Sequence, residues 1–387
     1  MTRFRFDIQA TDGAARTGII SMQRGEICTP AFMPVGTAAT VKAMKPESVR
    51  ATGADIILGN TYHLMLRPGA ERVARLGGLH DFMRWDRPIL TDSGGYQIFS
   101  LAERRRMREE GAEFRSHLDG SLHLLTPERA TEIQAQLGSD IAMVLDECIA
   151  TPAEEAIARA AMERSVRWAE RSRRRLAELR SGDASAGEVV VTNPGQAQFG
   201  IIQGATFPHL RSQSVDATVA LGFDAYAIGG LSVGEEPTVM YDVVAHTAPQ
   251  LPVDRPRYLM GSGMPDDLVE CIARGIDLFD CVLPTRNARN GGLLTRSGPI
   301  AIKNARHAED FGPVDADCGC YTCRNFSRAY LRHLYIAGEM AAGMLNTVHN
   351  LYYYLDTMRR IREAIKFNTF EKLRQEFRLT FSRRPQY

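Results

Sequence analysis

An acid and two arginines lie close together in residues 279–291, FDCVLPTRNARNG. Asp280 ends an apolar run, so its carboxylate should be half buried, and Arg286 and Arg289 follow in a segment of Pro, Asn and Gly that predicts a cationic loop. A buried acid repels anionic ligands, whereas arginines attract them. The combination suits a ligand that joins an anionic backbone to an electrophilic carbon.

Two further acids follow apolar runs of the same kind. Asp92 lies in LTDSGGYQIF and Asp146 lies in VLDEC. Carboxylates that share a pocket can transfer a glycosyl group, because one attacks the anomeric carbon while another protonates the leaving group and deprotonates the entering group. We expect Asp280 to be the nucleophile and Arg286 and Arg289 to hold flanking phosphates, so that the electrophile is a ribose carbon on a polyanion.

The residues around these acids indicate a pocket for a flat heterocycle. Ser93 precedes two glycines, and Tyr96 offers an aromatic face. Gln203, in IIQGA, can both donate and accept, and residues 229–235, GGLSVGE, expose backbone amides. Together they fit a purine. Each of these features also has a purely structural explanation. An Asp after a strand often caps a helix, and Gly-Gly often only forms a turn. A methionine such as Met260 is more often a core residue.

Three cysteines and a histidine form the pattern C-x-C-x2-C-x25-H, which begins with CGCYTC. Three thiolates and one imidazole complete a tetrahedral Zn²⁺ and leave no position for water, so we expect a structural zinc. The expected ligands are Cys318, Cys320, Cys323 and His349. Clustered thiols without a metal would oxidise, which disfavours three unrelated thiols. His307 and His333 are the alternative fourth ligands.

Eight short apolar runs must position these residues. They are residues 31–37, 55–60, 88–95, 140–148, 199–205, 225–232, 257–263 and 276–284. Such runs are typical of strands that are buried on both faces of a parallel sheet. Helical patterns lie between most of them, which predicts an α/β fold with an irregular (β/α)8 TIM barrel and an active site at the C-terminal ends of the strands. A doubly wound open sheet or two α/β domains are the alternatives.

Capping signals mark three of the helices. Residues 126–138 and 265–275 each begin with a Pro at the first helical position and end in Gly. Residues 151–180 open with Thr151 and Glu154, which predicts a capping box.

The remaining segments complete the predicted organisation. Residues 1–30 alternate polar and apolar positions and predict an antiparallel ribbon that caps the barrel. Residues 31–300 would form the barrel core, with a flexible insert at 181–198. Residues 301–350 would form the zinc-binding subdomain, and residues 351–387 would be C-terminal helices that complete the barrel.

Composition narrows the class of protein. The 387 residues carry a net charge of +1, so a nucleic acid would have to be held by a local patch. Seven cysteines without an export signal predict a cytoplasmic protein with reduced thiols. No apolar run approaches 18 residues, which predicts no membrane span.

Several segments together resemble the bacterial tRNA-guanine transglycosylases, also called queuine tRNA-ribosyltransferases. They are TDSGGYQ (91–97), GGLSVGE (229–235), FDCVLPTRNARNG (279–291) and the cysteine–histidine set, and the similarity runs from TPAFMPVGTAATVKA (29–43) to the last helices. The resemblance implies an irregular barrel with a zinc subdomain, a homodimer and no organic cofactor. It further implies that guanine at the wobble position of the tRNAs for Asp, Asn, His and Tyr, read through U-G-U, is exchanged for 7-aminomethyl-7-deazaguanine (preQ1).

Matching motifs transfer roles to single residues. Asp280 is similar to the nucleophile on ribose C1′, Asp92 to the general acid/base, and Arg286 and Arg289 to the tRNA-binding segment. The residues expected to bind the base are Asp92, Ser93, Tyr96, Asp146, Gln203, Gly230, Leu231, Val233 and Met260. Among these, the Leu231 carbonyl would accept the aminomethyl group, and Tyr96 and Met260 would sandwich the flipped base. Val233 stands where relatives that use bulky queuine have glycine, which favours preQ1.

Two other function classes share some of these features. A glycoside or nucleoside hydrolase on a barrel would use the acids but needs neither the arginines nor the zinc module. A non-catalytic RNA-binding subunit would be free to lose Asp92 and Asp280, and both are present.

Overall fold

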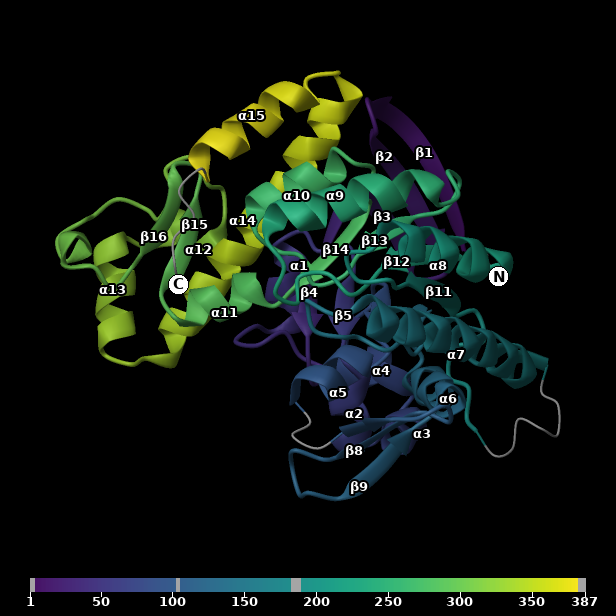
Figure 1. Cartoon of the computed structure of the whole chain (residues 1–387). Helices are drawn as coiled ribbons and strands as arrows, with labels where there is room; N and C mark the ends of the chain where they lie inside the picture. Colours follow the sequence, from purple (N-terminus) through teal and green to yellow (C-terminus); the bar gives the residue numbers. More distant parts are fainter. Residues whose placement is uncertain (1–3, 102–104, 182–188, 382–387) are drawn as a thin grey trace.

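Eight parallel strands form a closed barrel in the computed structural model, which describes residues 4–101, 105–181 and 189–381 (Figure 1). Around the barrel the order is β4–β5–β6–β10–β11–β12–β13–β14, and β14 pairs back with β4. The strands are β4 (Ala31–Gly36), β5 (Ile57–Gly59), β6 (Ile89–Thr91), β10 (Ile141–Met143), β11 (Ala197–Ile202), β12 (Ala225–Ile228), β13 (Arg257–Leu259) and β14 (Leu278–Cys281). Each overlaps one of the eight predicted runs, so the barrel is confirmed and the open sheet is wrong.

Helices connect the strands and cover the outside of the barrel (Figure 1). They are α1 (Pro46–Ala51), α2 (Thr61–Leu66), α3 (Ala70–Arg75), α4 (Gly78–Met83), α5 (Gly95–Leu101), α6 (Pro127–Leu137), α7 (Glu155–Ser181), α8 (Pro208–Ala220), α9 (Pro237–Thr247), α10 (Pro265–Ile272) and α11 (Leu283–Arg289), with a 3-10 turn η2 (Ala248–Gln250). No helix in the described ranges combines the length and apolar composition that crossing a membrane requires.

Local signals explain where two of these helices begin and end. Thr126 Oγ1 accepts a hydrogen bond from the N–H of Arg129 at 3.1 Å, which caps α6, and Gly138 ends the helix in the left-handed region. At α10, Pro265 stands in the first turn, where the acids Asp266 and Asp267 face the positive helix end. Both helices lie where the sequence predicts them.

The predicted capping box at Thr151 is wrong. α7 begins only at Glu155, and Thr151 Oγ1 has no hydrogen-bond partner among the described residues. The Thr151 carbonyl lies against Gly234 in the loop after β12, where an added Cβ would come within 3.0 Å of it. This tertiary contact holds residues 151–154 in an irregular connection, and tertiary contacts readily override local capping preferences.

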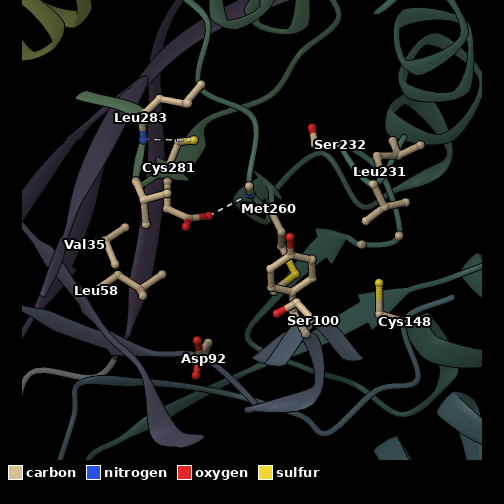
Figure 2. Close-up of a pocket in the computed structure, with 18 of the residues that line it drawn as sticks. Val35, Leu58, Asp92, Ser100, Cys148, Leu231, Ser232, Met260, Cys281 and Leu283 are labelled. Atoms are coloured by element: carbon tan, nitrogen blue, oxygen red, sulfur yellow. Dashed lines mark hydrogen bonds between the residues drawn. The ribbon is translucent and has the colours of Figure 1, made fainter. Parts of the chain in front are cut away.

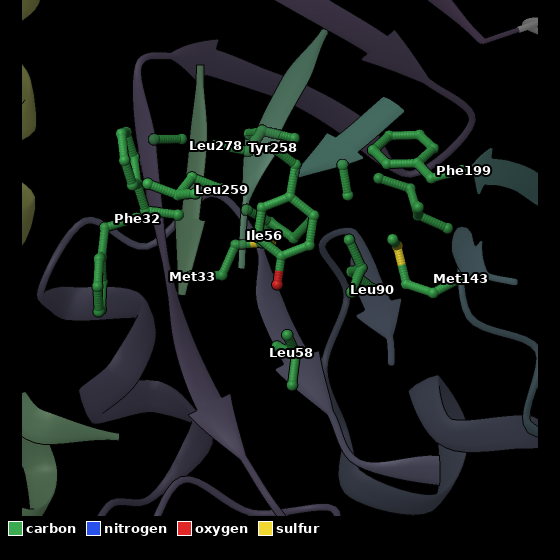
Figure 3. Close-up of a cluster of buried hydrophobic side chains, with 14 of the residues drawn as sticks. Phe32, Met33, Ile56, Leu58, Leu90, Met143, Phe199, Tyr258, Leu259 and Leu278 are labelled. Carbon is green, nitrogen blue, oxygen red and sulfur yellow. The ribbon is translucent and has the colours of Figure 1, made fainter. Parts of the chain in front are cut away.

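Apolar side chains fill the inside of the barrel (Figure 3). Met33, Leu90 and Tyr258 are completely buried there, and Leu58 is nearly so. Burying side chains of this size stabilises the fold by roughly 2 kcal/mol each. Tyr258 is the polar exception, and its hydroxyl points toward the C-terminal ends of the strands (Figure 3), where it meets Asp280.

An antiparallel sheet of β1 (Arg5–Asp12), β2 (Ala15–Met22) and β3 (Gly25–Thr29) packs beside the barrel, as predicted for the N-terminal strands. Arg16 on β2 donates to both carboxylate oxygens of Asp277, at 2.9 and 2.6 Å. Both residues are buried, and Asp277 immediately precedes β14. The bidentate pair therefore ties the sheet to the end of the barrel opposite the strand C-termini.

The C-terminal part of the chain combines a hairpin with helices. Its elements are β15 (Gly292–Thr295), β16 (Gly298–Ala301), a 3-10 turn η3 (Ala305–His307), α12 (Tyr321–Asn325), α13 (Arg328–Ile336), α14 (Met340–Lys366) and α15 (Phe370–Thr380). A second apolar cluster around Leu293, Val314 and Leu331 forms its own core. The long helix α14 contacts α11 and α13 as well as β4, so it joins this part to the barrel.

Two sheets were not predicted from the sequence, the β15–β16 hairpin and a second antiparallel sheet. β7 (Arg105–Met107), β8 (Ala112–Arg115) and β9 (Leu122–Leu125) form a three-stranded antiparallel sheet between α5 and α6. Of the predicted insert at 181–198, residues 182–188 lie outside the described residues. The segment after them is anchored, because Asn193 Nδ2 donates to the Ser139 carbonyl at 3.0 Å and Gln196 Nε2 donates to the Gln134 carbonyl at 3.0 Å.

Glu270→Gln is expected to lower the free energy of unfolding by on the order of 3 kcal/mol at pH 7, because it breaks a buried ion cluster. Glu270 on α10 receives Arg374 and Arg378 from α15 and Arg274 from its own helix, at 2.6–2.9 Å. Although burial alone would raise the pKa of Glu270, these hydrogen bonds hold it well below its usual range. The stabilisation is therefore present above the ordinary pKa of a glutamate and is lost as the pH falls below it.

Thermal unfolding between pH 3 and pH 8 would check this. Glu371→Gln is the matched control, since Glu371 pairs with Arg374 at 3.0 Å but its side chain is 57% exposed. A melting-temperature difference between Glu270→Gln and wild type that stays constant with pH would contradict the assignment.

Candidate active site

A cavity of about 560 Å³ opens at the C-terminal ends of the barrel strands, where the sequence predicts the active site (Figure 2). Of the predicted site residues, those that line it are Asp92, Ser93, Tyr96, Asp146, Gly230, Leu231, Val233, Met260, Asp280 and Arg286. Gln203 and Arg289 are not among its lining residues. With Val35 on β4 and Leu58 on β5, the lining residues lie on seven of the eight strands or on the segments that follow them, and β11 is the exception.

Asp280 has one carboxylate oxygen fixed and the other open. Tyr258 Oη donates to Oδ1 at 2.5 Å, and the Gly261 N–H donates to the same atom at 2.9 Å. Among the described residues, none donates to Oδ2. Burial raises the pKa of Asp280, and these two donors oppose that shift. The side chain is thus oriented through Oδ1 while Oδ2 can approach an electrophile.

Asp92, after β6, has donors at both oxygens. Thr61 N–H donates to Oδ1 at 2.8 Å, and Asn60 Nδ2 and Gln97 Nε2 donate to Oδ2 at 2.5 and 2.8 Å. Burial raises the pKa of Asp92 to about 6, the Asn60 and Thr61 donors oppose that rise, and the negative charge of Asp280 adds to it. A carboxyl group that titrates near 6 can both give and take a proton close to neutral pH.

The two carboxylates enter the cavity from different sides of the barrel. Asp280 is on β14 and Asp92 follows β6, with β4 and β5 between them in the barrel order. The open oxygen of Asp280 suits a nucleophile, and the titration of Asp92 suits an acid that becomes a base. This arrangement can carry out two successive displacements at one anomeric carbon, which retain its configuration.

Asp92→Asn is expected to gain stability relative to wild type as the pH rises from about 4 to 8. The pKa of Asp92 is about 6 in the folded protein and about 4 in the unfolded chain, so the unfolded chain loses this proton at lower pH. The free energy of unfolding of wild type therefore falls as the pH rises from about 4 to about 6, by on the order of 3 kcal/mol in total. Asparagine does not titrate, and its amide nitrogen can take the place of Oδ2 if the amides of Asn60 and Gln97, which both donate to that atom, turn their oxygens toward it. Melting temperatures of both proteins across this range test it, and a constant difference would contradict the raised pKa.

Asp146 forms a second polar wall of the cavity. Ser93 Oγ donates to Oδ1 at 2.9 Å, and Gln203 Nε2 donates to Oδ2 at 2.7 Å. Burial raises the pKa of Asp146, and both donors oppose that shift. Gln203 thus stands behind Asp146, and its Oε1 lies so close to Gly230 that an added Cβ there would come within 2.3 Å.

The loop after β12 presents backbone groups to the cavity. Gly230 has φ +66, which favours glycine, and Ser232 has φ +59. Glu235 accepts hydrogen bonds from the N–H groups of Ser232 and Val233. Since a trans peptide places its C=O opposite its N–H, the Leu231 carbonyl points away from Glu235 and is available as an acceptor. Cys148 also lines the cavity (Figure 2).

Two side chains that line the cavity are suited to contact a planar ring. Tyr96, on α5, is 48% exposed, and Met260, after β13, is partly buried. An exposed aromatic ring next to a cavity is a surface on which a planar ligand can stack. Whether the two side chains sandwich one ring stays a prediction.

The prediction that Arg286 and Arg289 lie in a loop is wrong, because both residues belong to helix α11. Pro284 occupies the first turn of that helix, a position that prolines favour, and α11 packs against α14. Arg286 is exposed and lines the cavity, whereas Arg289 donates to the Thr285 carbonyl at 2.9 Å. Three residues apart, the two arginines lie on the same face of α11, and of the two only Arg286 lines the cavity.

The three cysteines and His349 meet as predicted. The ligand atoms of Cys318, Cys320, Cys323 and His349 all lie within 4.8 Å of one another. His349 Nδ1 is 3.3–3.7 Å from the three sulfurs, and Nε2 is 2.7 Å from the Leu294 carbonyl. A carbonyl only accepts, so Nε2 carries the proton and Nδ1 offers its lone pair to the same centre as the thiols. The residues therefore fit a bound metal ion, and neither His307 nor His333 takes part.

Several residues of the site received no role from the sequence. Asn60 ends the predicted apolar run 55–60 and Gln97 ends the TDSGGYQ segment, and the structure shows that both donate to Asp92. Tyr258 was not found, although a tyrosine inside an apolar strand needs a partner for its hydroxyl, which is a usable signal. Glu235 is the fourth residue without a predicted role. Nothing in the segment GGLSVGE indicates that its carboxylate accepts hydrogen bonds from backbone N–H groups.

Comparison with known proteins shows the family of this chain. A family model described as queuine tRNA-ribosyltransferase matches residues 11–383. Three similar proteins, each named queuine tRNA-ribosyltransferase, come from Novosphingobium aromaticivorans (60% identical, covering 98% of both chains), Sphingopyxis alaskensis (58% identical, 98% of this chain and 99% of that protein) and Zymomonas mobilis subsp. mobilis (56% identical, 98% and 96%). The chain therefore belongs to the queuine tRNA-ribosyltransferase family.

Proposed function

We propose that this protein is a tRNA-guanine transglycosylase that exchanges guanine at the wobble position of tRNA for preQ1, a step of queuosine biosynthesis. The observation that carries this proposal is the pair of acids across one cavity, Asp280 with an open oxygen and Asp92 titrating near 6. Family membership supports a transferase that acts on tRNA.

In the first displacement, Asp280 Oδ2 attacks C1′ of the nucleotide. A bond forms between this oxygen and C1′ while the bond from C1′ to the guanine nitrogen breaks. The nitrogen keeps the electron pair, and Asp92 supplies a proton to the departing base. The tRNA is then joined to the protein as a ribosyl ester of Asp280, with Tyr258 and the Gly261 N–H still holding Oδ1.

In the second displacement, preQ1 enters the cavity and Asp92 takes a proton from it. The ring nitrogen attacks C1′, the ester bond breaks, and Asp280 leaves as a carboxylate. Two inversions restore the original configuration at C1′. No nucleotide triphosphate is required, because a glycosidic bond is broken and remade.

The base would be selected by the second polar wall and the β12 loop. We assign Asp146, Ser93, Gln203 and the Gly230 backbone to its polar edge. The Leu231 carbonyl would accept from the aminomethyl group, and Val233 would keep the cavity too narrow for queuine. Tyr96 and Met260 would stack on the two faces of the ring.

The tRNA would be held at the rim of the cavity. We assign Arg286 and Arg289 to the phosphates beside the wobble nucleotide, in tRNAs that carry U-G-U in the anticodon loop. We also propose that the protein acts in the cytoplasm as a homodimer. The metal would be Zn²⁺, which prefers three thiolates and an imidazole and has no open position here for chemistry.

Incorporation of radiolabelled guanine into unmodified tRNA for Tyr tests the function directly. Wild-type protein should incorporate the label, preQ1 should block incorporation, and Asp280→Asn should be inactive. No incorporation by folded, metal-loaded protein would overturn the transferase and favour a hydrolase or an RNA-binding subunit.

A further inference from the structure

Arg211 is a buried charge that the proposed chemistry does not use. It lies in the first turn of α8 and is completely inaccessible to solvent. Among the described residues it forms no ion pair, and its Nη2 atom has no hydrogen-bond partner. Burial lowers the pKa of the guanidinium to about 10, which reflects the cost of enclosing the charge. The positive end of the helix adds to that cost.

The other guanidinium atoms bind three backbone carbonyls at the edge of the active site. Nη1 donates to Ile202 O at 2.9 Å and to Gly229 O at 2.8 Å, and Nε donates to Ala205 O at 2.8 Å. Ile202 immediately precedes Gln203, and Gly229 immediately precedes Gly230. The Arg211 side chain therefore binds the backbone next to Gln203 and Gly230, the two groups assigned to base recognition.

These contacts begin where the regular pairing of the strands stops. The β11–β12 register ends at the pair Ile202 and Ile228, and the Gly229 N–H makes one more bond to Ile202 O at 3.0 Å. Beyond it, Ala205 adopts φ +48, which is unfavourable for a residue with a side chain. Arg211 thus replaces the missing ladder bonds and holds a strained residue.

Small shifts of the ends of β11 and β12 would displace Gln203 and Gly230, which follow them. Gln203 Nε2 holds Asp146 Oδ2 at 2.7 Å, while its Oε1 packs against Gly230 without room for a Cβ. The backbone N–H of Gln203 donates to Ser214 Oγ, also on α8, at 3.0 Å. If the ends of β11 and β12 moved apart, Gln203 would have to lose either Asp146 or Gly230.

We propose that Arg211 is a positioning residue for base recognition, which locks the ends of β11 and β12 so that Gln203 and Gly230 face the base at fixed separation. This inference rests on the proposed function, because it takes the base as the ligand of that wall. It also explains why a charge is kept where an apolar side chain of similar volume would cost less to bury.

Binding of guanine and of preQ1 to Arg211→Lys tests this, measured by isothermal titration calorimetry so that no catalytic step is needed. Lysine keeps the charge but cannot reach all three carbonyls. We expect both bases to bind about tenfold more weakly, since misplacing recognition groups by a fraction of an ångström has effects of this size. Affinity for tRNA should change by less than about twofold, because the tRNA is assigned to a different rim of the cavity.

Arg257→Lys is the matched control for the loss of a buried arginine. Arg257 also has a pKa lowered by burial, and it donates to backbone carbonyls of Leu251 and Gly275, but it begins β13 at the opposite end of the barrel. The substitution Arg257→Lys should lower the melting temperature as Arg211→Lys does, and it should leave the affinity for both bases unchanged. In a Gln203→Ala background, Arg211→Lys should weaken base binding less than it does in wild type, because one of the two groups that Arg211 positions is gone.

Each outcome supports or overturns the inference. Wild-type protein that binds neither base would overturn the proposed function before Arg211 is tested. If wild type binds and Arg211→Lys binds within twofold of it, or if the Gln203→Ala background leaves the loss undiminished, Arg211 is only structural. Should Arg211→Lys fail to fold, Arg211→Gln, which keeps an amide donor, replaces it in the same comparison.

Discussion

Asp280→Asn is expected to abolish base exchange and to leave tRNA binding unchanged. The asparagine Oδ1 can still accept from Tyr258 and from the Gly261 N–H, so the geometry around it is preserved. The amide that takes the place of Oδ2 carries no negative charge and cannot attack C1′. Loss of a nucleophile of this kind lowers kcat on the order of 10⁴-fold or more. Guanine incorporation measures kcat, and fluorescence titration with labelled tRNA measures the dissociation constant.

A second readout isolates the covalent step. Wild-type protein incubated with tRNA should form a protein–RNA adduct that survives denaturing electrophoresis, and Asp280→Asn should not. Asp55→Asn is a suitable control, because it makes the same chemical change before β5, at the other end of the barrel. Turnover by Asp280→Asn above about one per cent of wild type would move the nucleophile elsewhere.

The barrel could be predicted because its signals are local. Each strand is a short apolar run between polar ends, and α6 carries both a Thr cap and a C-terminal Gly. The long helix α7 shows the limit of such signals. The pattern at Thr151 is as good a cap as that at Thr126, yet residues 151–154 meet the distant loop at Gly234 and do not continue into α7.

The elements that sequence reasoning missed depend on partners far along the chain. The sheet of β7, β8 and β9 has short strands with mixed polarity, and its inner residue Phe114 is buried against Tyr62 from α2. The segment of α11 reads as a loop, but packing against α14 makes it a helix. Tertiary burial decided the structure in both places, and a single sequence does not reveal which partner will supply it.

Candidate residues of the site divide in the same way. The acids, glycines and cysteines that we assign to catalysis or to ligand binding lie in short, recognisable sequence segments. Asp280, Asp92 and the proposed metal ligands could therefore be identified from the sequence. The residues that orient them could not, since Tyr258 meets Asp280 and Asn60 meets Asp92 only once the barrel closes. Arg211 is the extreme case, because its partners are backbone carbonyls that have no signature in the sequence.

The helix α14 connects the cysteine–histidine cluster to the face that we assign to tRNA. This helix carries His349, and on either side of it Asn346 Nδ2 donates to Ala288 O at 3.2 Å and Asn350 Nδ2 donates to Pro284 O at 3.0 Å. Both acceptors belong to α11, which presents the two arginines. A change in the register of α14 would therefore displace the cationic rim of the cavity more than its base-binding wall.

Cys323→Ser is accordingly expected to lose the metal, to unfold at lower temperature, and to weaken tRNA binding more than preQ1 binding. The cluster offers four ligands, and a serine hydroxyl is a much weaker metal ligand than a thiolate, so Cys323→Ser should leave well under one ion per chain. Metal analysis, thermal unfolding and the two affinities measure this. Cys28→Ser makes the same change away from the cluster and should match wild type. An unchanged metal content would refute the site, and an equal loss of both affinities would refute its coupling to α11.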